Sequence, residues 1–165
     1  MKKTFLIILA TVLFSCKPCE KQLQSEEQIV NSVLDNWHKA AAAANFENYF
    51  NLMTDDAIFI GTDATENWNK TAFQAYAKPH FDKGKAWSFI AIERNVFFST
   101  NGKTAWFDEL LNTQMKICRG SGVLVKENGK WKIKHYVLSM TVPNDVSKEV
   151  IQIKSKIEDK ILHKN

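Results

Sequence analysis

The sequence predicts an α+β domain in which helices precede a curved antiparallel sheet. Up to residue 77 the apolar residues recur mostly at helical spacing, interrupted by one short apolar run at residues 57–61, whereas from residue 86 onward they form long runs typical of strands. The dipeptides Asn101-Gly102 and Asn128-Gly129 are strong turn signals that divide these runs into hairpins. This order of elements favours helices packed on one face of a bent sheet.

Length and composition are those of an ordinary globular protein. The chain has 165 residues, which suits one domain. Hydrophobic residues make up 45% and charged residues 24% of the sequence, and 12% aromatic residues favour a core or pocket walled by rings. A formal net charge of +4, which includes Lys2 and Lys3, is too balanced to indicate a nucleic-acid partner.

The start of the chain has the pattern of a targeting segment. Lys2 and Lys3 precede an apolar run at residues 5–14, which is much shorter than the roughly 20 residues that a membrane-spanning helix needs. A short apolar run behind basic residues is typical of a signal peptide, which we place at residues 1–15.

Residues 13–16 read Leu-Phe-Ser-Cys and resemble the lipobox of bacterial lipoprotein precursors. The resemblance implies that Cys16 is acylated and becomes the first mature residue. Residues 16–24 would then be a lipidated polar tether that anchors the protein to a bacterial membrane in the cell envelope. The alternative is an ordinary signal peptide that is cut nearby, with Cys16 incidental.

The cysteines and histidines do not follow the pattern of a metal or redox site. Cys16 and Cys19 are spaced as C-x-x-C, but lipidation would consume the first, and the sequence has no second pair. The four histidines lack metal-ligand spacing, so we predict no metal and no cofactor. A disulfide between Cys19 and Cys118 is possible in an oxidising compartment.

The predicted domain spans residues 25–145 and begins with helices. Residues 25–28, Ser-Glu-Glu-Gln, match a capping box at which the first helix should begin, and helical spacing continues to Ala44. Aromatic residues between positions 46 and 53 predict a second, short helix packed across the first.

A short strand and a third helix connect these helices to the sheet. The strand is predicted at residues 57–61, and a polar loop follows at residues 62–69. Asn69 should cap the third helix, which Pro79 should end or kink. Four long strands are then predicted at residues 87–99, 104–115, 119–126 and 130–142.

Residues 146–165 are predicted to form an amphipathic helix. Its apolar residues form a narrow stripe, namely Val146, Val150, Ile153, Ile157 and Ile161. Either the stripe packs on the domain's own sheet, or it contacts a second protomer in a homodimer.

Four stretches of the domain resemble the SnoaL-like family of the nuclear-transport-factor-2-like superfamily. They are residues 61–68, 104–109, 119–124 and 129–133, within a region of roughly residues 29–145. The resemblance implies a cone-shaped fold, in which a curved sheet wraps the N-terminal helices and leaves a pocket. Some members are ketosteroid isomerases, polyketide cyclases or dehydratases, and others only bind partners, so the fold does not fix the function.

The last strand carries a candidate catalytic histidine, His135. Many relatives have a histidine two residues later, where this chain has Val137. Strict alternation would place His135 beside Trp131 on the inner face of the sheet, as a proton carrier or as a buried histidine satisfied by its neighbours. A three-residue loop between the last two strands would bring Arg119 and Ser121 close to His135, and a two-residue loop would turn both outward.

The first hairpin places an acidic residue opposite Arg94. A two-residue turn would place Glu109 opposite Arg94, and a three-residue loop would place Asp108 there. The pair can be purely structural. Alternatively, the carboxylate is a general base tuned by burial, and His135 or Arg119 polarises the substrate. Arg119 could instead hold an anionic ligand or pair with the carboxylate.

We expect the tryptophans to form the core and line the pocket. We expect His38 and His80 to be exposed or packed on helices. The candidate pocket residues are Trp37, Trp68, Arg94, Trp106, Arg119, Ser121 and Trp131, and the candidate catalytic residues are Asp108, Glu109 and His135.

Three functional hypotheses remain open. In the first, the pocket binds a small, partly apolar molecule. If the protein is an enzyme, the expected reaction is a cofactor-free proton transfer. In the second, the domain is a non-catalytic binding or interaction module whose pocket is filled by its own aromatic rings. In the third, the protein is a dimeric lipoprotein that uses the outer sheet face and the C-terminal helix.

Overall fold

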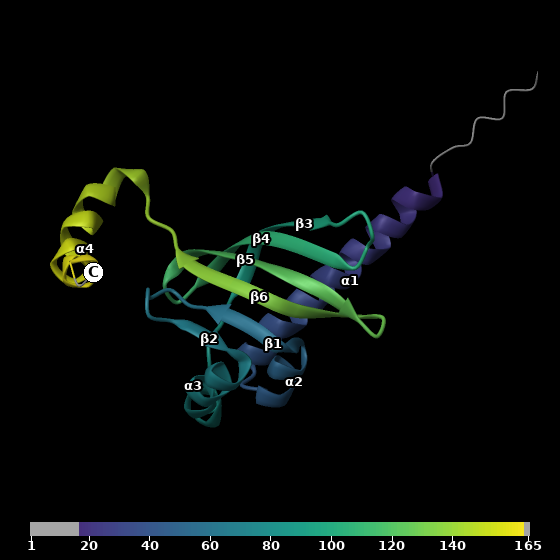
Figure 1. Cartoon of the computed structure of the whole chain (residues 1–165), viewed down its shortest axis with the longest axis horizontal. Coiled ribbons are helices and arrows are strands. Elements are labelled where there is room, and N and C mark those ends of the chain that lie inside the picture. The colour runs from purple at the N-terminus through teal and green to yellow at the C-terminus, as the bar shows by residue number, and fades with distance from the viewer. Residues whose placement is uncertain (1–16, 164–165) are drawn as a thin grey trace, which may run out of the picture.

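The computed structural model describes residues 17–163, so the predicted signal peptide and Cys16 lie outside the described residues. One curved sheet packs against three helices, which are α1 (Lys17–Ala42), α2 (Phe46–Asn51) and α3 (Lys70–Asp82). Figure 1 shows α1 running behind the sheet, with α2 and α3 below it. The result is the cone-like α+β fold that was predicted.

The sheet has six strands in the order β2-β1-β6-β5-β4-β3. The neighbouring strands are antiparallel, as predicted, except that β1 runs parallel to β6. The reason is that β1 belongs to the helical half of the chain and joins the sheet beside its last strand. The strands are β1 (Met53–Ile60), β2 (Asn67–Asn69), β3 (Ile90–Phe98), β4 (Thr104–Thr113), β5 (Lys116–Glu127) and β6 (Lys130–Met140).

Two helix boundaries differ from the prediction. Helix α1 begins at Lys17 rather than at the capping box, because residues 19–24 are mostly good helix formers and Pro18 lies in the first turn, where proline is tolerated. Helix α3 continues past Pro79 to Asp82. Only its last turn follows the proline, so few helical hydrogen bonds are affected. The predicted cap is confirmed, since the Ala72 amide donates to Asn69 Oδ1 at 2.9 Å.

Aromatic side chains fill the interior of the cup between the sheet and the helices. The Trp37 ring packs 4.8 Å from the centroids of both Tyr49 and Tyr136. The rings of Phe59 and Phe73 stack with centroids 4.0 Å apart. The high aromatic content therefore forms a core of interlocking rings.

An irregularity in β6 reverses the predicted orientation of His135. Asn128 and Gly129 have positive φ angles of 50° and 78° and form a two-residue turn. Leu124 pairs with Ile133 but Val123 pairs with His135, so Lys134 is an extra residue, as in a β-bulge. Beyond the bulge the alternation is shifted by one residue, and His135 faces outward. The prediction that His135 shares the inner face is therefore wrong.

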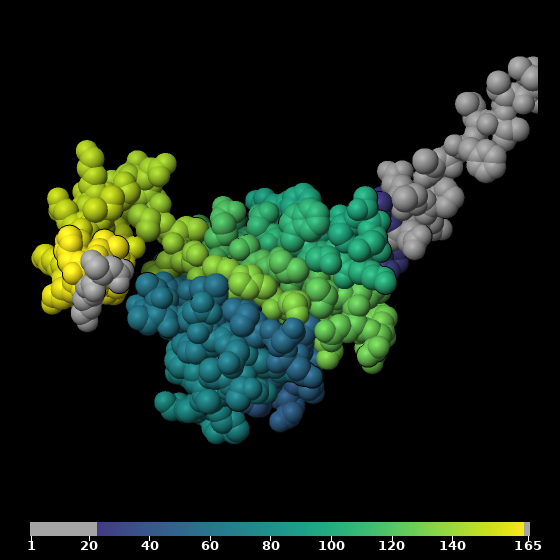
Figure 2. All heavy atoms as spheres, in the orientation of Figure 1, coloured from purple at the N-terminus to yellow at the C-terminus, as the bar shows by residue number. Residues whose placement is uncertain are grey.

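The C-terminal helix α4 (Ser147–Leu162) follows a short 3-10 turn, η1 (Asn144–Val146). None of the residues in α4 is buried. In Figure 2 this helix stands apart from the body of the domain, to which it is joined by a narrow neck. The alternative that the stripe packs on the domain's own sheet is therefore not what the structure shows.

The Cys118 thiol, one half of the possible disulfide, is buried and free in this structure. Within residues 17–163, every helix is too short or too polar to cross a membrane.

Candidate functional site

A buried carboxylate, Glu109, is the centre of a polar cluster inside the cup. Its side chain on the inner face of β4 is 0% exposed. Oε1 accepts hydrogen bonds from His38 Nε2 at 2.9 Å and from the Tyr136 hydroxyl at 3.1 Å. Oε2 accepts from Arg94 Nε at 2.9 Å, and Arg94 Nη2 lies 2.8 Å from the same oxygen. We call these four residues the Glu109 cluster.

Arg94 connects the cluster to the surface of α1. Residues 100–103 form the loop of the first hairpin, and its register places Arg94 opposite Glu109. This confirms that Arg94 has an acidic cross-strand partner. Its Nη1 also donates to Asp35 Oδ1 at 2.8 Å and to Asn31 Oδ1 at 3.2 Å. The guanidinium therefore joins the sheet to the helix that crosses it.

The charges in the cluster keep Glu109 ionised. Burial raises the pKa of Glu109, but the hydrogen bond from His38 and the charges of His38 and Arg94 outweigh burial and hold that pKa below its ordinary value. Burial, together with the negative charge of Glu109, raises the pKa of Tyr136 well above its ordinary value. Tyr136 is thus a neutral donor to a carboxylate.

Gly120 provides the space in which the cluster assembles. It lies opposite Glu109 on β5, and a Cβ atom built at this position would collide with the Tyr136 hydroxyl and lie 2.9 Å from Glu109 Oε1. A larger residue would separate Tyr136 from Glu109, which explains glycine at this position on a central strand.

Several predicted site residues lie on the outer face of the sheet. Arg119 is exposed, and its Nη1 lies 3.5 Å from Asp108 Oδ1, which makes the two a surface ion pair. Ser121 pairs with Asp108 on β4, and Trp106 is 45% exposed. The predicted grouping of Arg119 and Ser121 with His135 in an inner pocket is therefore wrong. The two-residue turn between β5 and β6 turns Arg119 and Ser121 outward, and the bulge in β6 does the same for His135.

Two members of the cluster were missed by sequence reasoning. His38 was expected to be exposed or packed on a helix, yet it is 4% exposed and reaches a carboxylate 71 positions away. Tyr136 faces inward only because of the bulge. For His38 a signal existed, because it neighbours the buried Trp37 in the middle of an apolar helix face.

The predicted tryptophans occupy three different environments. Trp37 is a core residue at 1% exposure, and Trp131 is 3% exposed and packs against Phe98. Trp68 is half-buried and lines an open cleft. Trp106 lies on the outer face and is not part of a pocket wall.

An aromatic cleft of about 160 Å³ opens at the end of the cup between β1, α3 and the β4–β5 turn. Trp68 and Tyr76 stack with centroids 4.5 Å apart at its edge. Among the described residues that line it, Glu66 is the one charged side chain. The lining consists of Phe59, Gly61, Thr62, Glu66, Trp68, Phe73, Tyr76, Trp87, Phe89, Gln114, Met115 and Leu138.

Other hollows in the described part of the chain have at most one aromatic residue in their lining. One of about 460 Å³ between α1 and α2 is lined mainly by Asn, Lys and Ala residues. A second of about 300 Å³ lies beside His38 and Phe89 but does not include Glu109. In the described part of the chain, no three His, Cys, Asp or Glu side chains are grouped in a way that could hold a metal ion.

Comparisons with known proteins agree with this architecture. A family model described as SnoaL-like domain matches residues 30–143. A nuclear-transport-factor-2-like protein of unknown function from Pseudomonas putida KT2440 superposes with a TM-score of 0.62 at 14% identity, covering 75% of this chain and 92% of that chain. No curated protein matches the sequence significantly.

Two further solved structures have names that refer to an activity. A protein named as a dehydratase of the same superfamily, from Streptomyces avermitilis, has a TM-score of 0.64 at 12% identity and covers 73% of this chain and 99% of its own. A protein named as a scytalone dehydratase, from Novosphingobium aromaticivorans DSM 12444, has a TM-score of 0.61 at 12% identity. The match covers 74% of this chain and 89% of that chain. At such identities the likeness shows the fold alone.

Proposed function

Because the chain belongs to the SnoaL-like domain family, we propose that it is a pocket protein that binds a small, largely apolar molecule in the aromatic cleft. The observation that carries this proposal is the lining of the cleft, in which the half-buried rings of Trp68 and Trp87 meet the buried ring of Phe73. Apolar walls with a few polar groups are typical of small-molecule sites.

Size and charge restrict the ligand. A volume of about 160 Å³ is below the roughly 300–1,000 Å³ of pockets that enclose drug-sized molecules, so the cleft suits a ligand of one or two rings. Since Glu66 contributes the one charge of the described lining, a carboxylate ligand would be repelled. We therefore expect an uncharged or cationic ligand.

The geometry supports binding over proton transfer. Both oxygens of Glu109 are occupied by donors from His38, Tyr136 and Arg94, which leaves this carboxylate poorly placed to accept a proton from a substrate. The other candidate base, Asp108, lies on the outer face beside Arg119 and does not line the aromatic cleft.

The test is a thermal-shift and calorimetric screen of single-ring and two-ring phenols, ketones, amines and carboxylic acids. Neutral or cationic compounds should raise Tm, and Trp68→Ala should weaken their binding at least tenfold because it removes a ring from the wall. Trp106→Ala is the matched control, since this tryptophan lies on the outer face. Unchanged affinity in Trp68→Ala would contradict the site, and conversion of the ligand to product would contradict a purely binding role.

We also propose that the chain is tethered to a bacterial membrane through Cys16, because the lipobox-like residues 13–16 end the apolar run. Cys16→Ser should move the protein from the membrane fraction to the soluble fraction after cell lysis. Cys19→Ser is the control and should stay with membranes. Membrane association of both variants would rule out lipidation of Cys16.

A further inference from the structure

Two apolar surfaces of this chain have no partner within the described residues. The first, the α4 stripe, consists of Val146, Val150, Ile153, Ile157 and Ile161, of which Ile153 and Ile157 are 65% and 66% exposed. A 16-residue helix that buries none of its side chains gains little stability from its own sequence, because helices in proteins depend on packing of an apolar face.

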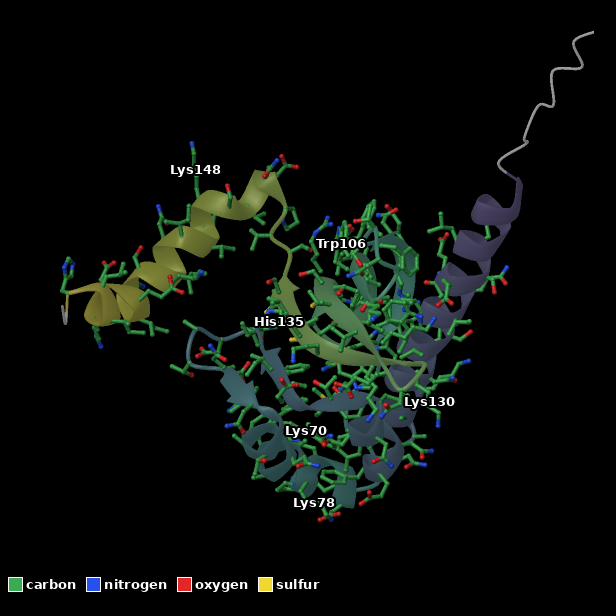
Figure 3. All side chains as sticks on the ribbon, turned by 45° about the vertical axis from the view of Figure 1, so that its right-hand side comes forward. Lys70, Lys78, Trp106, Lys130, His135 and Lys148 are labelled. Carbon is green, nitrogen blue, oxygen red and sulfur yellow. The ribbon has the colours of Figure 1, made fainter. Side chains whose placement is uncertain are left out.

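The second surface is the outer face of the sheet. Phe97 on β3 and Trp106 on β4 are paired across the strands, stack with centroids 6.0 Å apart, and are 47% and 45% exposed. The pairing continues to Val123 on β5, so an apolar row crosses three strands. We call this row the outer row. In Figure 3 the sheet that carries Trp106 and His135 is separate from α4, which carries Lys148.

The connection between β6 and α4 keeps the helix away from the outer row of its own chain. The amide and hydroxyl of Thr141 both donate to the Ile117 carbonyl, at 3.2 and 2.7 Å, which extends the sheet to residue 141. Only Val142 and Pro143 then precede η1, and proline has a fixed φ. A helix that leaves the end of its sheet in this way can reach a neighbouring molecule more easily than its own sheet face.

We propose that α4 is an exchange arm that packs its stripe on the outer row of a second copy of this chain, in a reciprocal dimer. Each copy supplies one stripe and one row, so a two-fold arrangement covers all four surfaces. A helix of this length is about 24 Å long and about 10 Å wide, and two such contacts bury roughly 1,000 Å², the size at which specific interfaces begin.

A membrane surface fits α4 less well. Interfacial helices usually carry Trp or Phe on the apolar side and an excess of basic residues on the polar side. The segment Ser147–Leu162 has no aromatic residue, and it contains four lysines and three acidic residues, so its excess of positive charge is small. Outside the stripe, Ile151 and Leu162 are also exposed, so the apolar residues of α4 do not form the single wide face that immersion in lipid requires.

Sedimentation of the full-length protein at tens of micromolar concentration tests the proposal. Wild type should be a dimer. The double substitution Ile153→Glu/Ile157→Glu (the helix variant) and Trp106→Glu (the face variant) should each be monomers, with the dimer Kd raised at least tenfold. The charge-matched control Gln152→Glu/Ser155→Glu, on the opposite side of α4, should remain dimeric. Because Ile153 and Ile157 are exposed in the single chain, the helix variant should still unfold cooperatively, which shows that its domain is folded.

Mixing the two defective variants separates an exchanged arm from other dimers. An equimolar mixture should regain dimers, because the intact helix of the face variant meets the intact row of the helix variant. A mixture that stays monomeric, or a wild-type dimer that the helix variant leaves intact, would overturn the proposal. So would a monomeric wild type, including one whose binding to anionic lipid vesicles depends on Ile153 and Ile157.

Discussion

Glu109→Gln is expected to lower the free energy of unfolding by about 3 kcal/mol. The substitution leaves the buried Arg94 guanidinium without its main counter-charge, and breaking a buried pair costs about 3–5 kcal/mol. We expect the lower end of this range because Asp35 remains 2.8 Å from Arg94. Urea denaturation followed by tryptophan fluorescence measures the change.

Asp108→Asn is the matched control, since this neighbouring carboxylate lies on the outer face in a surface ion pair. It should change the free energy of unfolding by less than about 0.5 kcal/mol. Equal effects of the two substitutions would mean that the Glu109 cluster does not hold α1 on the sheet.

The pH dependence of stability provides a second readout of the same cluster. The pKa of Glu109 is lowered in the folded protein, so the unfolded chain takes up its proton at higher pH. The resulting stabilisation is fully present above the ordinary carboxyl pKa of roughly 4.3 and is lost as the pH falls through the lower folded value. Glu109→Gln should therefore be less stable than wild type at pH 7, and this difference should shrink on acidification.

Trp131→Ala is expected to destabilise the domain by about 3–5 kcal/mol, as removal of a buried aromatic ring does. The ring is 3% exposed and packs on Phe98, and its Nε1 donates to Glu26 Oε2 at 2.7 Å. It therefore joins the β5–β6 hairpin to the first half of α1. Lys132→Ala, on the other face of the same strand, should change stability by less than about 0.5 kcal/mol.

The same denaturation experiment decides the face assignment on β6. A loss of less than about 1 kcal/mol in Trp131→Ala would place this ring at the surface. The first half of β6 would then have the opposite orientation to the one described here.

Local patterns in the sequence determined the elements and the first hairpin. Turn residues such as Asn101-Gly102 act over a few positions, so they fixed the register that places Arg94 opposite Glu109. Helical and strand periodicities report which face of an element is apolar, which is why the α+β order and the core positions of Trp37 and Trp131 were predictable.

Only the tertiary structure decided which polar groups meet. One extra residue at Lys134 moved His135 out of the cup and Tyr136 into it, and a single-residue shift reverses every later side chain of a strand. His38 reaches Glu109 across 71 positions, a contact that depends on how α1 crosses the sheet. Periodicity shows that a surface must be covered but not what covers it, so the sequence identified the α4 stripe without identifying its partner.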